Sequence, residues 1–220
     1  MGNIMQKCKH WLALLATHAG NEELLNLLLE YANMDVNWTF QECKWTLLHE
    51  AAEIGNEKVL KIILENKHVS VNQSTINGTT PLIAAAYEGH VEVVKMLLEQ
   101  DNINVNQSSH TGATALLLAA DKGYVKIVEM LIKREEIELN VQDEDGDTAL
   151  FVAAKMGHHN VVKMLLKKEN IEVNLANWAG ETPLLVAADE RNGEVVNLLL
   201  GTEAIKAIRW NGWRPIANPA

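Results

Sequence analysis

The chain has 220 residues, with 29 acidic and 19 basic side chains, so its formal net charge at pH 7 is −10. Nucleic-acid binding needs a positive stripe, and this charge balance argues against it. No apolar run approaches the roughly 20 residues that a membrane span requires, so we expect no membrane insertion. The N-terminal residues lack the apolar core of a secretory signal. Cys8 and Cys43 cannot make a disulfide framework, which indicates a reducing compartment, the cytoplasm or the nucleus.

The first 77 residues predict two units that are less regular than the later ones. The first unit, at about residues 10–43, lacks the glycine phrase that recurs further along the chain. We expect Trp11 and Trp38 to supply its core and its cap, because the end of a stack lacks one neighbour. The second unit, at about residues 44–77, begins its first helix after Thr46 and keeps a histidine, His49, three residues later.

From residue 78 onward, a phrase of the form Gly-x-Thr-Pro/Ala-Leu recurs every 34 residues, at Gly78, Gly112, Gly146 and Gly180. An alanine pair, a second glycine, an aliphatic run and a closing Val-Asn or Leu-Asn keep the same register. The second glycines are Gly55, Gly89, Gly123 and Gly157. A fixed period of this length predicts a stack of repeats rather than one closed globule.

Each repeat predicts two helices joined by turns. The threonine of the phrase, such as Thr80, can accept a backbone N–H and begin the first helix, and Pro81 suits its first position. The second glycine, such as Gly89, suits a left-handed residue that ends this helix. The aliphatic run predicts one face of a second, amphipathic helix. Asn77-Gly78 marks a tight turn at the tip between repeats.

These features together resemble the ankyrin repeat, and the segment from Tyr87 to Val94 is close to the consensus of that family. The resemblance covers nearly the whole chain. It implies an all-α fold, a solenoid of stacked helix-turn-helix units with hairpin-like tips, in a single domain over residues 1–220. The units fall at about residues 10–43, 44–77, 78–111, 112–145, 146–179 and 180–211, followed by a partial unit or cap at 212–220.

The last part of the chain departs from the pattern at two places. Arg191 stands where the earlier repeats have the glycine that ends the first helix, and we expect a distorted turn there. The segment from Asn211 to Ile216 resembles the start of another unit. Either it caps the stack and buries Trp210 or Trp213, or the chain is a piece of a longer array.

No motif for catalysis or metal binding is complete. The segment from Asp143 to Asp147 hints at a calcium loop, but Val141 and Val152 stand where an EF-hand needs acidic residues. No ligand partner shares the face of His158 and His159. Neither a phosphate-binding loop nor a nucleophile elbow is present. We therefore expect no enzyme, no cofactor and no metal.

The resemblance implies that the tips and first helices form a concave side, the usual contact surface of the family. Large apolar residues that vary there between units suggest interface anchors, although each could instead pack on a neighbouring tip. The candidate anchors are Trp45, Ile76, Tyr87, Met156 and Trp178. The polar candidates on the same side are His110, Glu144, Asp145, Asp147 and Glu181.

The acidic candidates have two interpretations. They form either a solvated surface or a docking strip for a basic segment of the partner, where charge aids encounter and specificity. In the second case we expect Trp178 and Met156 to hold a hydrophobic residue of the partner. The acidic patch beside them consists of Glu144, Asp145, Asp147 and Glu181.

Two asparagines match a modification pattern. The segments from Leu29 to Asn37 and from Leu166 to Asn174 resemble the Leu-x5-Asp/Glu-Val-Asn pattern that an asparaginyl hydroxylase recognises in ankyrin repeats. Asn37 and Asn174 are therefore candidate modification sites. The alternative is that each asparagine only braces its loop.

Taken together, these features predict a monomeric, non-enzymatic protein–protein interaction module that acts as an adaptor or as an inhibitor by occlusion. Its expected partner is a protein or a peptide. Two alternatives from other classes stay open. The array could be the regulatory or targeting portion of a larger enzyme, channel or effector protein whose other domains are absent from this chain, or it could be a structural spacer.

Overall fold

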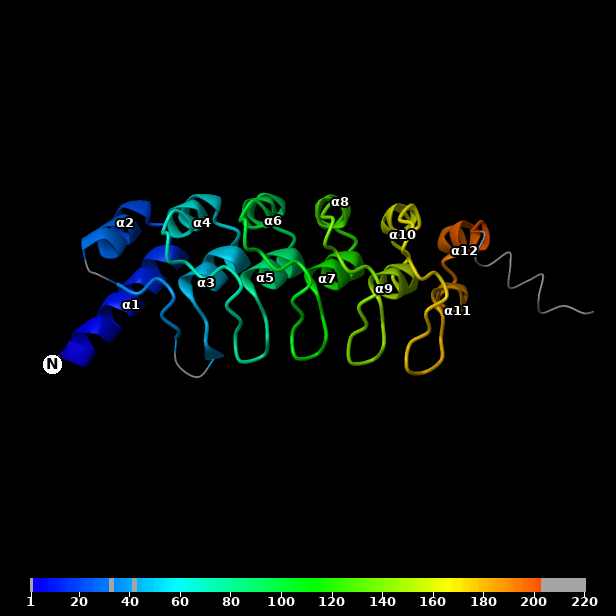
Figure 1. Cartoon of the computed structure of the whole chain (residues 1–220), viewed down its shortest axis with the longest axis horizontal. Helices are drawn as coiled ribbons and strands as arrows, with labels where there is room; N and C mark the ends of the chain where they lie inside the picture. Colours follow the sequence, from blue (N-terminus) through cyan, green and yellow to red (C-terminus); the bar gives the residue numbers. More distant parts are fainter. Residues whose placement is uncertain (1, 32–33, 41–42, 203–220) are drawn as a thin grey trace, which may run out of the picture.

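The structure is a computed structural model that describes residues 2–31, 34–40 and 43–202. Over these residues it contains twelve helices in six stacked pairs (Figure 1). The first helices of the pairs are α1 (Gly2–His18), α3 (Leu47–Ile54), α5 (Pro81–Glu88), α7 (Ala115–Asp121), α9 (Ala149–Lys155) and α11 (Pro183–Asp189). The second helices are α2 (Glu22–Tyr31), α4 (Glu57–Leu64), α6 (Val91–Leu98), α8 (Val125–Ile132), α10 (His159–Leu165) and α12 (Gly193–Leu200).

The first helices form one row and the second helices form another. The tips that connect successive pairs project at the edge of the stack that lies away from the second helices (Figure 1). Within the described ranges, the only β feature is an isolated antiparallel bridge between Phe40 and Trp45. The expected all-α solenoid is therefore confirmed. The segment 211–216, which could cap the stack or begin another unit, lies outside the described residues.

A threonine begins each first helix from α3 to α11. It stands in extended conformation before the helix, and its side-chain oxygen accepts the backbone N–H of the residue three positions later. Pro81 and Pro183 follow at the start of their helices, where a missing N–H costs little. The predicted caps are thus confirmed at Thr46, Thr80, Thr114, Thr148 and Thr182.

Left-handed residues follow these first helices. Gly55, Gly89, Gly123 and Gly157 all have φ between +69° and +83°, as predicted. Arg191 adopts the same conformation with φ +60°, and its N–H donates to Ala188 O as that of Gly123 donates to Ala120 O. The turn at Arg191 is therefore regular, and the expectation of a distorted turn was wrong. A non-glycine residue can occupy this region at a cost of about 1–2 kcal/mol.

The glycine after α7 also lies against the next unit. A Cβ on Gly123 would come within 2.6 Å of Nδ1 of His158. Nε2 of that histidine donates to the carbonyl of Asp121 at 2.8 Å, so the ring spans two units. Gly55 and His90 repeat the arrangement two units earlier. Glycine is needed here both for its left-handed backbone and for the space that the imidazole fills.

One continuous apolar core runs between the helix rows and through the whole stack. In the first unit, Trp38 stacks on His10 with ring centroids 4.3 Å apart and meets the edge of Phe40 at 4.7 Å. Trp38 is therefore half-buried and packs against the core of this unit. Trp11 also contacts the edge of Phe40, but it remains 44 % exposed at the border of the core.

Candidate functional site

Backbone hydrogen bonds join the tips into a continuous strip. One residue of each tip donates its N–H to a carbonyl of the preceding tip, with N···O distances between 2.8 and 3.0 Å. These donors occupy the same position in successive units and all have exposed side chains. We call them the tip column: Ile76, His110, Glu144 and Trp178. The strip gives these side chains a fixed order along one edge of the stack.

The tips before α5, α7, α9 and α11 are also closed internally by a polar side chain. In the tip before α9, the carboxylate of Asp143 accepts the N–H groups of Asp145 and Asp147 at 3.0 and 2.8 Å. Thr75, Ser109 and Asn177 act in the same way in the other tips. The tips are therefore built before any partner arrives, which lowers the entropy cost of binding.

The acidic candidates divide into surface and structural residues. Glu144, Asp145 and Glu181 are exposed. Asp147 is half-buried, and its carboxylate accepts a hydrogen bond of 3.0 Å from Nδ2 of Asn177. Burial raises the pKa of Asp147, while the hydrogen bond from Asn177 acts against this rise. This carboxylate helps to hold two tips together, so it is not a freely available surface charge.

The candidate anchors near the C-terminal end of the described stack are widely exposed. Trp178 is 68 % exposed and Met156 is 54 % exposed. The indole of Trp178 lies against Gly146, where a Cβ would come within 2.7 Å of the ring. The N–H of Trp178 also donates to Asp145 O at 3.0 Å, so the structure brings this aromatic residue to the acidic tip. Trp178 therefore packs on the preceding tip, as the alternative interpretation of the sequence has it, while its role as an interface anchor stays a prediction.

The structure brings Trp45, Tyr87 and His110 together around a cavity of about 470 Å³. We call it the Trp45–Tyr87 cavity. It lies between α3, α5 and α7 and the tips before α5 and α7, and residues from three consecutive units line it. Its lining consists of Trp45, Glu53, Asn77, Thr79, Ile83, Ala84, Tyr87, Glu88, Ser109, His110, Thr111, Ala113 and Leu118.

Hydrogen bonds and charges fix the aromatic walls of this cavity. Nε1 of Trp45 donates to Glu50 at 2.9 Å, and the same carboxylate lies 2.8 Å from Nδ1 of His18. Nζ of Lys122 lies 4.8 Å from the centre of the Tyr87 ring. Units pack on both sides of Tyr87, but its side chain remains 46 % exposed.

Two acidic residues, Glu53 and Glu88, line the Trp45–Tyr87 cavity. Burial raises the pKa of Glu53, and the negative charges of Glu50 and Glu88 raise it further. The site therefore combines aromatic walls with a carboxylate, that of Glu53, whose charged form is destabilised by burial and by the neighbouring carboxylates.

Comparison with protein families agrees with this architecture. A family model described as ankyrin repeats (3 copies) matches residues 67–143 and 133–209, and one described as ankyrin repeats (many copies) matches residues 10–64. The chain belongs to the ankyrin repeat family. Ankyrin repeats are generally protein–protein interaction modules and are typically not catalytic. No curated protein gives a significant match to this chain.

His49 is the one histidine of this ankyrin array that stands three residues after a capping threonine, and it lies beside the cavity. Its Nδ1 accepts the N–H of Thr46 at 3.3 Å, and its Nε2 donates to Thr79 O at 3.0 Å. Its ring centroid lies 5.1 Å from that of Trp45. Burial lowers the pKa of His49 to about 4, so the neutral ring links the cap of α3 to the next tip.

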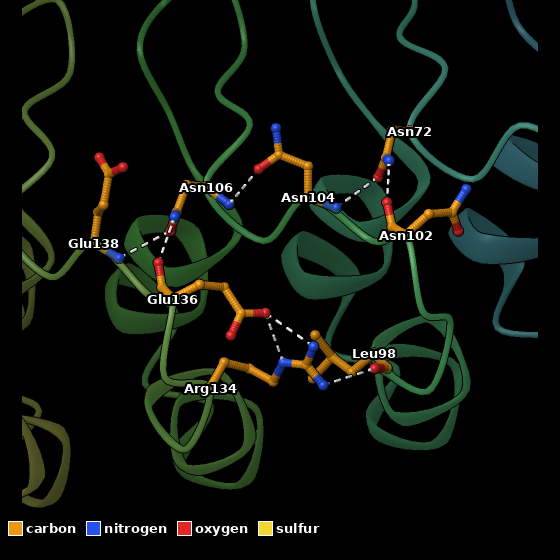
Figure 2. A network of polar contacts seen from close by, with 8 residues as sticks. All are labelled: Asn72, Leu98, Asn102, Asn104, Asn106, Arg134, Glu136 and Glu138. Atoms are coloured by element: carbon orange, nitrogen blue, oxygen red, sulfur yellow. Dashed lines mark hydrogen bonds and ion pairs between the residues drawn. The ribbon is translucent and has the colours of Figure 1, made fainter.

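Asparagines that recur at the same position of successive loops bind each unit to the next (Figure 2). Nδ2 of Asn106 donates to Glu136 O at 2.7 Å, and its Oδ1 accepts the N–H of Glu138 at 2.9 Å. Asn72 and Asn140 make the same pair of bonds to the unit that follows each of them.

Asn37, one of the two candidate modification sites, makes bonds of the same kind. Its Nδ2 donates to His68 O at 2.6 Å, and its Oδ1 accepts the N–H of Ser70 at 2.7 Å. Asn37 therefore has the bracing role that the sequence left as an alternative. For Asn174, the corresponding positions of the next unit, residues 204 and 206, lie outside the described residues.

Other kinds of site find no support in the described part of the chain. No group of three or more His, Cys, Asp or Glu side chains among these residues could hold a metal ion. No described helix has the length and apolar character needed to cross a membrane. Cys8 and Cys43 are exposed free thiols.

Proposed function

We propose that this ankyrin array is a non-enzymatic protein-binding module whose partner lies along the tips and the first helices. The observation that carries the proposal is the exposure of Tyr87, which is 46 % exposed in the interior of the stack beside a cavity. Buried aromatic contacts supply much of the energy of protein interfaces. An aromatic side chain that the stack itself leaves uncovered is therefore suited to a partner.

Other residues of the same face support an extended interface. Ile76, Met156 and Trp178 are 50–68 % exposed, and large apolar side chains with such exposure mark interaction surfaces when they gather on one face. Trp45 is half-buried and forms a wall of the cavity rather than a projecting anchor. Trp178 and Met156 serve as a second anchor at the far end of the strip.

The charge of this face favours a partner with a basic segment. Glu144, Asp145 and Glu181 are exposed on neighbouring tips, and the whole chain carries a net charge of −10. Complementary charge accelerates encounter and aligns the partner. The array acts as an adaptor or as an inhibitor by occlusion, as a monomer, in the cytoplasm or the nucleus. The alternative is the regulatory or targeting portion of a larger enzyme, channel or effector protein.

Hydroxylation of Asn37 and Asn174 is a separate proposal that rests on the sequence pattern alone. Incubation with an active asparaginyl hydroxylase should add the mass of one oxygen to the peptide that carries either residue. Mass spectrometry without this gain on both peptides would remove the idea. Asn72, which makes the same pair of bonds but lacks the acidic residue before Val71, serves as the control.

Site-specific photo-cross-linking tests the proposed binding face. A benzophenone amino acid is placed singly at each member of the tip column and at the matched exposed residues of the second helices, Lys61, Lys95, Glu129 and Lys163. Both series step by 34 residues through consecutive units, so they differ only in the face that they sample.

In an extract of the source cells, we expect the same partner band from several positions of the tip column and none from the second-helix series. The band is then identified by mass spectrometry. Cross-links that come from the second helices instead, or equally from both series, would contradict the proposed face.

A further inference from the structure

We infer that the Trp45–Tyr87 cavity binds an arginine side chain of the partner, with its methylene groups against the aromatic walls and its guanidinium at Glu53 and Glu88. This inference rests on the proposed function and adds the chemistry of the partner's anchor. Three properties carry it, each taken over the described residues: the walls of the cavity, its carboxylates without an ion pair, and its single occurrence on the tip face.

The walls fit the apolar part of such a side chain. Trp45, Ile83, Ala84, Tyr87 and Leu118 contribute apolar surface to a cavity of about 470 Å³. This volume lies within the range of about 300–1,000 Å³ of small-ligand pockets. Arginine buries its methylene groups along apolar surface, and its flat guanidinium stacks on aromatic rings more readily than a lysine ammonium does.

The charge of the cavity fits the guanidinium. Neither Glu53 nor Glu88 forms an ion pair with any residue that the structure describes. Glu50, the third carboxylate nearby, is already held by Trp45 and His18. A cation between Glu53 and Glu88 would relieve the repulsion that raises the pKa of Glu53. The planar fork of arginine can serve two carboxylates at once.

The other charged groups near the cavity leave this preference intact. Lys122 lies over the Tyr87 ring and 3.7 Å from Asp121, with which it pairs. Its position shows that the ring can hold a cation. His110 is exposed on a tip that lines the cavity, and the ring of His90 bonds to the backbone of Glu53 rather than to its carboxylate.

The cavity is not a general feature of the repeat. At the positions equivalent to Tyr87, the second, fourth, fifth and sixth units have Glu53, Asp121, Lys155 and Asp189. At the positions equivalent to Trp45, the third to sixth units have Thr79, Ala113, Asp147 and Glu181. An aromatic pair thus occurs at one place on the described tip face, which gives the partner's anchor a defined register along the strip.

Titration of the whole ¹⁵N-labelled chain with N-acetyl-arginine amide tests the inference by NMR. The indole N–H signal of Trp45, assigned with the Trp45→Phe variant, should shift saturably with a dissociation constant of about a millimolar, as suits a ligand of this size. The uncharged isostere N-acetyl-citrulline amide should bind at least about tenfold more weakly, because it offers no charge to the two glutamates.

Two double variants locate the effect. Glu53→Gln with Glu88→Gln should weaken arginine binding by about tenfold or more. Asp189→Asn with Glu190→Gln removes the same net charge at the equivalent positions of the last described unit and should change binding less than about twofold. Equal binding of arginine and citrulline, or equal losses in the two double variants, would overturn the inference.

The cross-linking experiment keeps this inference separate from the proposed function. Partner cross-links from the tip column without saturable arginine binding would contradict the arginine site alone. Arginine binding without any cross-link from the tip column would overturn the proposed protein-binding face and leave the cavity as a site for a small cation.

Discussion

Tyr87 and Trp178 are both exposed aromatic residues, but they are exposed for different reasons. Tyr87 lies on α5 with units on both sides and is still 46 % exposed, whereas Trp178 lies on the last described tip and is 68 % exposed. The core shows the same contrast, because Ile83, Leu117 and Phe151 are at most 4 % exposed while their equivalent Leu185 is 58 % exposed. In a stack, the following unit sets the exposure of a residue.

This contrast separates two kinds of exposed residue. Exposure at the end of the described stack reflects the position of a residue in the array as well as any role in binding. A residue in the interior of the stack is exposed only where the units on both sides leave its side chain uncovered. The exposure of Tyr87 is therefore stronger evidence for an interface anchor than the exposure of Trp178.

The largest expected effect tests the role of the following unit. Phe151→Ala should destabilise the chain by about 3–5 kcal/mol, because the removed ring leaves a cavity under the next unit. Leu185→Ala should change the free energy of unfolding by less than about 1 kcal/mol, because that side chain is largely exposed. Urea unfolding of both variants gives the comparison. Similar losses would show that the end unit is as well covered as the interior.

A second test compares His49 with its apolar equivalents. Burial lowers the pKa of His49 from its ordinary value of 6.5 to about 4. The unfolded chain binds this proton below pH 6.5 and the folded chain only near pH 4, so stability falls as pH falls through this window. The shift corresponds to about 3 kcal/mol.

His49→Leu, which copies Leu117, supplies the control for this pH dependence. Between pH 6.5 and pH 4, the free energy of unfolding should fall less in this variant than in the wild type, because the contribution of His49 is absent. Parallel pH profiles for the wild type and this variant would show that His49 is not the titrating group.

A third test concerns the ends of the first helices. Gly123→Val should cost at least about 1 kcal/mol, because a β-branched residue disfavours the left-handed region and its Cβ would meet His158 at 2.6 Å. Arg191→Val should cost less, since Arg191 already carries a side chain at φ +60°. Thermal melting of both variants measures the two costs. Equal shifts in melting temperature would contradict this difference between the interior and the end of the stack.

The smallest expected effect is kinetic. Charge reversal at Glu144 and Asp145 should slow association with a basic partner at low salt and should fade as salt screens charges beyond about 8–10 Å. Asp147 is unsuitable for this test because its carboxylate holds Asn177. Stopped-flow association rates at two ionic strengths would measure the effect, and a salt-independent change would exclude steering by this tip.

The local features of the fold could be read from the sequence because neighbouring residues determine them. Thr80 caps its helix and Gly89 ends it through atoms only a few positions apart. The Trp45–Tyr87 cavity could not be derived in this way, because three units build it together. The tip role of Asp147 depends on Asn177, which lies 30 residues further along. Arg191 was misjudged because its identity suggested strain, whereas the backbone hydrogen bonds of the turn hold it in the regular conformation.

The central claim is that a partner binds the tip face through an anchor inside the array. Once cross-linking has supplied that partner, calorimetric binding to the wild type, Tyr87→Ala and Lys95→Ala tests the claim most directly. Tyr87→Ala should weaken binding by about tenfold or more and leave the melting temperature nearly unchanged. Lys95→Ala, on the opposite helix row, should change binding less than about twofold. Unchanged binding in Tyr87→Ala, or a larger loss in Lys95→Ala, would contradict the account.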